Sequence, residues 1–166
     1  PQEYTLTLID RMPFHGLKPE FYALAAGTKS DSDVRMNFPN SHRVNTIYGE
    51  ISDIDLDNQI VSVGQTKVDY SELIIGLGCE DKYHNVPGAD TYTHSIQTLS
   101  KARETFHSIS ELPKGAKVAI VGAGLSGIEL ASELRESRAD LEILLYDRGP
   151  RILRNFPEKL SNYISK

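Results

Sequence analysis

The sequence predicts an α/β fold with two lobes, each built on a parallel sheet. Residues 117–134 (KVAIVGAGLSGIELASEL) begin as an apolar run, continue into a glycine-rich turn and end in a helical pattern. An apolar run also ends twice in the same pair of charged residues, at Asp10-Arg11 and at Asp147-Arg148. Short runs that are apolar on both faces are typical of strands in buried parallel sheets. The repeated ending predicts the same kind of strand in each lobe.

The glycine turn follows the strand at once and has the spacing G-x-G-x-x-G, at residues 122, 124 and 127. In this context the spacing is typical of Rossmann-like dinucleotide-binding lobes. Gly122 permits the tight turn, Gly124 leaves room for a pyrophosphate, and Gly127 lets the helix lie close to the sheet. The amides of the first helical turn, those of Leu125 and Ser126 among them, would bind the phosphates. An ordinary glycine-rich turn is the alternative.

Asp147 ends the second strand of this lobe, at residues 141–146, and lies 20 positions after Gly127. Dinucleotide sites keep a carboxylate there for the ribose hydroxyls of the adenosine, which favours NADH over NADPH. Arg148 and Arg151 oppose that preference, because a guanidinium just beyond the strand could pair with a 2′-phosphate. The alternative is a solvated Asp at a strand end.

Glu129 lies two residues past the last glycine, on what we expect to be the first turn of the helix. A carboxylate there is stabilised by the helix dipole, which is a sufficient structural explanation. It is also close enough to the glycine turn to meet the nicotinamide end of a bound cofactor. Both interpretations stay open.

The first lobe is predicted from its periodicity and its turn residues. We expect a strand over residues 4–9, a short helix between Pro19 and Gly27, and a helix over residues 98–109. A strand at residues 44–51 and another at 59–63, joined through Asp57 and Asn58, predict an antiparallel excursion. The run at residues 73–78 is apolar on both faces and predicts a third buried parallel strand.

Two further expectations concern the boundary and the last helix. The turn residues Leu112-Pro113-Lys114-Gly115 place a lobe boundary after residue 112, which divides the chain into 1–112 and 113–166. The outer positions of the helix after Gly127 are expected to form a solvated face, at Glu133, Arg135, Glu136 and Arg138.

Composition excludes several classes of protein. The 18 Lys and Arg residues against 23 Asp and Glu give a net charge of −5 without a basic cluster, so nucleic acid is not an expected partner. The single cysteine, Cys79, excludes an internal disulfide and a C-x-x-C pair, and is either a packing residue or a reactive thiol. The five histidines lack H-E-x-x-H spacing, so no metal site is expected. No apolar run approaches the roughly 20 residues of a membrane helix, and a cytoplasmic location is expected.

Five segments, in chain order, resemble the two-dinucleotide-fold flavoproteins and are most similar to the type II NADH dehydrogenases (NADH:quinone oxidoreductases). They are LTLIDRMPFHGLKPEFYALAAGT, VDYSELIIGLGCE, VPGADTYTHSIQTLSKAR, VAIVGAGLSGIELASEL and ILLYDRGPRIL. In that family an NAD domain is inserted into an FAD domain. The flavin takes a hydride from NADH and passes electrons to a quinone or another acceptor.

The resemblance assigns residues to two cofactors. It implies that the FAD site includes Asp10, Arg11, Gly76, Leu77 and Gly78. It implies that the NADH site includes Gly122, Gly124, Leu125, Ser126, Gly127, Asp147 and Arg148, with Glu129 near the nicotinamide as the catalytic candidate.

The chain also departs from the family pattern, because no glycine turn precedes Asp10 and the later family segments are missing. We therefore expect an internal fragment: an incomplete FAD-type lobe with an antiparallel β excursion, and a truncated NAD-binding lobe. The fragment alone is expected to be inactive, to bind FAD weakly, and to be open to homodimer formation or strand exchange. The parent could attach peripherally to the inner membrane face.

A non-enzymatic NAD-sensing module is the alternative function. Such a sensor needs one dinucleotide site, whereas the paired strand endings at Asp10 and Asp147 predict two.

Asp147→Ala should narrow the preference of the parent protein for NADH over NADPH by roughly 1 to 3 kcal/mol, because it removes the acceptor of the ribose hydroxyls. Steady-state kinetics with both cofactors, before and after substitution, measure this. A wild-type protein that uses NADPH better would make Arg148 or Arg151 the deciding group.

Overall fold

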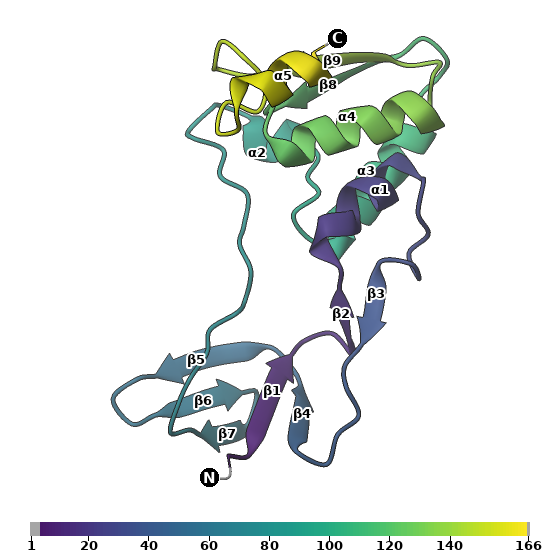
Figure 1. The fold of residues 1–166 in the computed structure, drawn as a ribbon. Coiled ribbons are helices and arrows are strands. Elements are labelled where there is room, and N and C mark those ends of the chain that lie inside the picture. Colours follow the sequence, from purple (N-terminus) through teal and green to yellow (C-terminus); the bar gives the residue numbers. More distant parts are fainter. Residues whose placement is uncertain (1–3, 166) are drawn as a thin grey trace. The chain divides into compact units, whose positions relative to one another are not determined.

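The computed structural model describes residues 4–165, which form helices and short sheets (Figure 1). Its residues cluster in two compact units. Unit 1 comprises Pro1–Gly16 and Arg35–Cys79, and unit 2 comprises Leu17–Val34 and Glu80–Lys166. The outer ends of the two predicted lobes, residues 1–3 and 166, lie outside the described residues. The mixed α/β class predicted from the sequence is confirmed.

Unit 1 contains a parallel pair of strands, β1 (Leu6–Asp10) and β4 (Val44–Tyr48). Their register runs from Leu6 beside Val44 to Asp10 beside Tyr48. A second, antiparallel pair consists of β2 (Phe14–Gly16) and β3 (Arg35–Asn37). Across it the guanidinium carbon of Arg35 lies 4.5 Å from the centre of the Phe14 ring, within the range of a cation–π contact.

A three-stranded antiparallel sheet completes the described strands of unit 1. It has the order β5 (Ile51–Asp55), β6 (Ile60–Val63) and β7 (Thr66–Asp69). The turn between β5 and β6 is closed by Asp55, whose carboxylate accepts hydrogen bonds from the backbone and side-chain amides of Asn58. These bonds hold the pKa of Asp55 below its usual value. The predicted antiparallel excursion is therefore present.

The prediction of one strand over residues 44–51 is wrong. The run is two strands, because β4 ends at Tyr48 and pairs in parallel with β1, whereas β5 starts at Ile51 and pairs antiparallel with β6. The break lies at Gly49, whose amide donates to the carbonyl of Asp10 and so closes the β1–β4 pair. An apolar pattern does not reveal such a change of partner.

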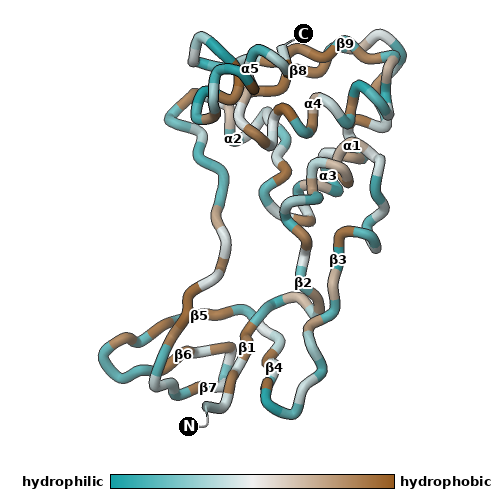
Figure 2. The backbone as a smooth tube through the Cα atoms, viewed as in Figure 1, coloured by the Kyte–Doolittle hydropathy of each residue, from teal (hydrophilic) through white to brown (hydrophobic). Residues whose placement is uncertain are grey.

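The prediction of a buried parallel strand over residues 73–78 is also wrong. These residues form no strand, and Ile74, Ile75 and Leu77 are 92%, 60% and 68% exposed. Figure 2 shows them in the brown stretch that follows β7. A strand needs a neighbour that satisfies its amides and covers its apolar side chains. No strand in the described part of the chain pairs with this run.

Unit 2 holds the predicted glycine turn. Its elements are η1 (Lys18–Glu20), α1 (Phe21–Ala26), α2 (Ala89–Tyr92), α3 (Leu99–Ser110), β8 (Lys117–Val121), α4 (Leu125–Ser137), β9 (Glu142–Tyr146) and α5 (Glu158–Ile164). The helices predicted at residues 19–26 and 98–109 are thus present. Strands β8 and β9 pair in parallel, from Lys117 beside Glu142 to Val121 beside Tyr146.

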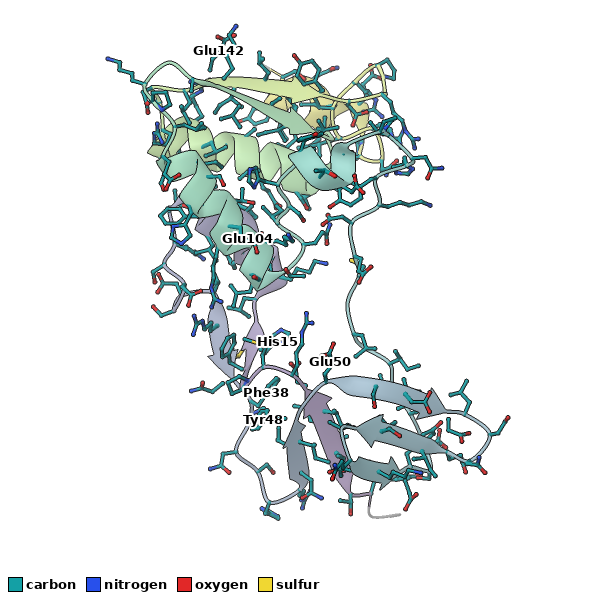
Figure 3. The ribbon with its side chains drawn as sticks, turned by 180° about the vertical axis from the view of Figure 1, so that it is seen from behind. His15, Phe38, Tyr48, Glu50, Glu104 and Glu142 are labelled. Carbon is teal, nitrogen blue, oxygen red and sulfur yellow. The ribbon has the colours of Figure 1, made fainter. Side chains whose placement is uncertain are left out.

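The core of unit 2 lies on both sides of α4, which Figure 1 shows between the β8–β9 pair and helices α1 and α3. Leu134 on α4 is fully buried in a cluster that includes Ile120 of β8 and Ile109 of α3. The opposite face of the β8–β9 pair is open, since Val121 and Tyr146 are 81% and 54% exposed. Figure 3 shows Glu142 pointing from β9 away from α4. The strands are therefore packed on one face only.

The predicted solvated face of α4 is wrong at Arg138. Its guanidinium donates to the carbonyl of Ile109 at 2.8 Å and to that of Leu112 at 2.9 Å, and it pairs with Asp140. The last carbonyls of a helix have no partner within that helix, so a neighbouring cation can cap them. Arg138 thus links the end of α4 to the end of α3.

Glu133 also departs from the predicted solvated face, because it is half-buried and accepts a hydrogen bond from the hydroxyl of Thr28, which follows α1. Arg135 and Glu136 are exposed, as predicted. Among the residues described, no helix is long and apolar enough to cross a membrane.

Candidate functional site

The glycine turn joins β8 to α4 in a tightly constrained way. Gly122 has a φ of +111°, which side chains rarely tolerate, and its amide donates to the carbonyl of Tyr146 at 2.7 Å. A Cβ atom at Gly127 would lie 1.9 Å from the carbonyl oxygen of Gly122. The first glycine therefore turns the chain, and the third lets α4 rest against that turn.

The N-terminus of α4 is open. Gly124 is the N-cap residue, and a Cβ built there has no neighbour within 4 Å. Leu125 and Ser126 are exposed in the first turn, and the amide of Ile128 is the first to donate within the helix, to the carbonyl of Gly124 at 3.1 Å. The first amides of a helix have no hydrogen-bond acceptor within that helix, and they lie at the positive end of its dipole. This end can accept an anion whose atoms come close to the backbone.

Asp147 ties the end of β9 to the glycine turn. Its carboxylate accepts hydrogen bonds from the amide of Ala123 at 2.8 Å and from the amide of Gly149 at 2.7 Å. Those two amides hold the pKa of Asp147 below its usual value, with smaller contributions from Arg154 and Arg148. Asp147 is therefore a carboxylate at neutral pH and lies beside the turn, as its spacing from Gly127 predicted.

The arginines after Asp147 differ in what they contact. Arg148 is exposed beside the carboxylate. Arg151 is half-buried and donates to the carbonyls of Arg154 and Phe156 within its own loop. Of the two arginines considered for a 2′-phosphate, Arg148 is thus the one whose side chain faces solvent.

Glu129 lies in the second turn of α4 rather than the first, because the helix begins at Leu125. It is half-buried, and burial raises its pKa, as does the nearby carboxylate of Glu20. The pKa of Tyr22 is raised in turn, first by burial and then by Glu129. Glu129 therefore sits where burial and the carboxylate of Glu20 in η1 disfavour its charge.

Asp10 ends β1 as Asp147 follows β9. Its carboxylate accepts a hydrogen bond at 2.8 Å from the amide of Met12, two residues on, just as Asp147 accepts one from Gly149. Arg11 is exposed, and Tyr48, labelled in Figure 3, is the register partner of Asp10 on β4. The two strand endings that match in sequence also match in local structure.

The remaining predicted residues, Gly76, Leu77 and Gly78, are exposed in the extended run after β7. They belong to unit 1 together with Asp10, whereas the glycine turn, Glu129 and Asp147 belong to unit 2. The structure therefore brings the predicted NADH residues together around one turn. The predicted FAD residues lie at two places of unit 1, the end of β1 and the extended run after β7.

Sequence reasoning missed the post-β9 loop (residues 149–156). The amide of Leu153 in this loop donates to the carbonyl of Ala123 at 2.8 Å. Leu153 is 2% exposed and has a φ of +48°, an uncommon conformation for a residue other than glycine. Gly149-Pro150 signals a turn after the strand, but nothing in the sequence indicates that the loop returns to the glycine turn.

No group of three or more His, Cys, Asp or Glu side chains suited to a metal occurs among residues 4–165. The side chain of Cys79 is exposed.

A family profile described as "Pyridine nucleotide-disulphide oxidoreductase" matches residues 2–166. The chain belongs to the pyridine nucleotide-disulphide oxidoreductase family. Its relatives in this family include the NADH dehydrogenase-like protein YutJ of Bacillus subtilis, which is 56% identical over 167 residues, 100% of this chain and 47% of YutJ. The type II NADH:quinone oxidoreductase of Staphylococcus aureus is 23% identical over 98% of this chain and 46% of its own length.

Solved structures share the fold of this chain. A structure of NDH2 from Plasmodium falciparum in complex with NADH superposes with a TM-score of 0.78 at 19% identity, over 96% of this chain and 40% of that protein. The chain thus spans about half the length, or less, of the proteins it matches.

Gly127→Ala should destabilise the intact protein by about 1 to 3 kcal/mol, because its methyl group would overlap the carbonyl of Gly122 and force α4 away. Gly124→Ala is the matched control. Its methyl group meets open space, and the loss of a glycine N-cap should cost less than about 1 kcal/mol. Urea unfolding of both variants measures the difference, and equal losses would contradict the close contact at Gly127.

Glu129→Gln should stabilise the protein at neutral pH and leave its stability unchanged in acid. Below the ordinary pKa of a glutamate both proteins carry a neutral group at this position. As the pH rises through the raised pKa of Glu129, the wild-type protein acquires a poorly solvated charge and loses stability relative to the variant. Melting temperatures over a pH series measure this, with Glu136→Gln on the exposed side of α4 as the control. A difference that does not change with pH would contradict it.

Proposed function

We propose that this chain is part of a flavoprotein oxidoreductase that takes a hydride from NADH. The observation that carries the proposal is the arrangement of the open N-terminus of α4, the glycine turn and the carboxylate of Asp147 around one point of unit 2. The names of the relatives, an NADH dehydrogenase-like protein and a type II NADH:quinone oxidoreductase, support it.

The residues of unit 2 fit a dinucleotide. The space beside Gly124 lets a pyrophosphate reach the first amides of α4, so phosphate binding needs no basic side chain. Asp147 is a carboxylate at neutral pH and would accept hydrogen bonds from the ribose hydroxyls of the adenosine. Its negative charge would repel the 2′-phosphate of NADPH. If the protein preferred NADPH, the guanidinium of Arg148 would bind that phosphate. NADH is the cofactor we assign here.

The residues of unit 1 fit the adenosine end of FAD. Asp10 stands at the carboxyl end of a parallel strand, next to the exposed Arg11, in the position that binds a ribose. The exposed backbone of Gly76, Leu77 and Gly78 is accessible to a large cofactor. Bound flavin would accept the hydride and pass electrons on. We propose that residues 1–112 are an FAD-binding part and residues 113–166 an NAD-binding part, with the boundary at the turn residues 112–115. Residues 17–34 and 80–112 of the FAD-binding part belong to unit 2.

Glu129 would act near the nicotinamide. It follows the glycine turn by two residues, and burial together with Glu20 holds its pKa above the usual value. A carboxyl group with a raised pKa keeps its proton to a higher pH than an ordinary glutamate does, and shifted pKa values of this kind are common at reacting centres. We propose that Glu129 orients the nicotinamide end of NADH.

The electron acceptor we propose is a quinone, on the strength of the Staphylococcus aureus relative. A quinone dissolves in the bilayer, so we expect the intact protein to bind peripherally to a membrane surface. The run after β7 in unit 1 resembles a strand without neighbours, because its apolar residues Ile74, Ile75 and Leu77 are exposed. We propose that a strand from another part of the parent protein, or from a second copy, covers these residues.

Anaerobic mixing of the intact protein with NADH tests the proposal. The yellow flavin absorbance should disappear within the time of mixing and return when a short-chain quinone is added. Gly124→Ala should raise the KM for NADH, because its methyl group fills the space for the pyrophosphate, whereas Ser132→Ala, on an exposed part of α4, should leave the KM unchanged. Tight NADH binding by a protein that carries no flavin would instead favour the NAD-sensing module.

A further inference from the structure

The post-β9 loop (residues 149–156) is held in shape by one side chain. Two guanidinium nitrogens of Arg151 donate to the carbonyl of Phe156, at 3.1 and 3.2 Å, and one of them also donates to the carbonyl of Arg154 at 2.9 Å. Hydrogen bonds from a charged donor are stronger than those between neutral groups. Arg151 therefore closes the loop on itself from within.

The closed loop is fixed at two further points. The amide of Leu153 donates to the carbonyl of Ala123 in the glycine turn at 2.8 Å. The hydroxyl of Ser161 on α5, which is 1% exposed, donates to the carbonyl of Ile152 at 2.7 Å. The left-handed backbone of Leu153 is held by this packing, since its side chain is 2% exposed. The loop thus lies between α5 and the glycine turn.

The backbone amide and carbonyl of Ala123 both form hydrogen bonds with the segment that follows β9. Its amide donates to Asp147 and its carbonyl accepts from Leu153. Ala123 stands between Gly122 and Gly124, so these bonds fix the part of the turn that a dinucleotide would approach. A glycine-rich turn without such bonds has many accessible backbone conformations.

We propose that the post-β9 loop braces the glycine turn, and that Arg151 is a positioning residue for dinucleotide binding. The inference rests on the function proposed above, but it assigns Arg151 a role different from that of a phosphate ligand. Two of its nitrogens already donate to loop carbonyls, so its contribution is the shape of the turn. Loss of that shape weakens NADH and NADPH equally, whereas loss of a phosphate ligand weakens NADPH alone.

The test compares Arg151→Ala, Arg151→Lys and the control Lys159→Ala, which removes a positive charge from exposed α5. Each is made in the intact protein. Arg151→Ala should raise the KM for NADH and for NADPH by the same factor, about tenfold, with kcat within about twofold of wild type. Arg151→Lys should raise KM less than Arg151→Ala does, because an ammonium group reaches one carbonyl but does not bridge two.

Hydrogen–deuterium exchange gives a readout that does not depend on the cofactor. A peptide that contains Ala123 should exchange faster in Arg151→Ala and at the wild-type rate in Lys159→Ala. If Arg151→Ala does not fold, Ser161→Ala loosens the same loop from α5 and should show the same paired rise in KM and in exchange.

Three results would overturn the brace: a KM that rises for NADPH alone, a kcat that falls while KM is unchanged, or exchange at Ala123 that stays at the wild-type rate. A fourth separates the two proposals. If the wild-type protein binds neither NADH nor NADPH while exchange at Ala123 still rises in Arg151→Ala, the dinucleotide function fails and the brace stands.

Discussion

The contact between Gly127 and the carbonyl of Gly122 is the constraint on which the organisation of unit 2 depends. A Cβ at Gly127 would lie 1.9 Å from that oxygen, so the absence of a side chain sets how closely α4 approaches β8. With α4 in this place, Leu134 reaches the cluster it shares with Ile120 and Ile109. The same approach leaves the first amides of α4 facing outward beside Gly124. One close backbone contact thus serves both the core and the candidate site.

Local patterns predicted the parts of the fold that are local. The strand, turn and helix around Gly122 to Gly127, and the position of Asp147 after β9, follow from glycine spacing and short apolar runs. Features that depend on distant partners were not predictable. The run at residues 73–78 looks like a buried strand because its residues are apolar, but burial requires a neighbour that its own sequence does not specify.

Arg138 and Leu153 show the same limit at the level of single residues. An arginine at an outer helix position has the pattern of a solvated residue, yet this one caps the carbonyls of Ile109 and Leu112 from an element almost 30 positions earlier. Leu153 adopts a left-handed backbone that its residue type disfavours, and only the returning loop explains it. Side chains that bond distant backbone groups leave no periodic signal in a sequence.

A site made largely of backbone amides has an evolutionary consequence. At the open end of α4 the groups that would meet a phosphate belong to the main chain, so Leu125 and Ser126 could be exchanged for other residues without removing a ligand. Drift in side chains is then tolerated, whereas a single methyl group at Gly127 is not. Exchanges at Leu125 and Ser126 should therefore cost this turn less than an exchange at Gly127.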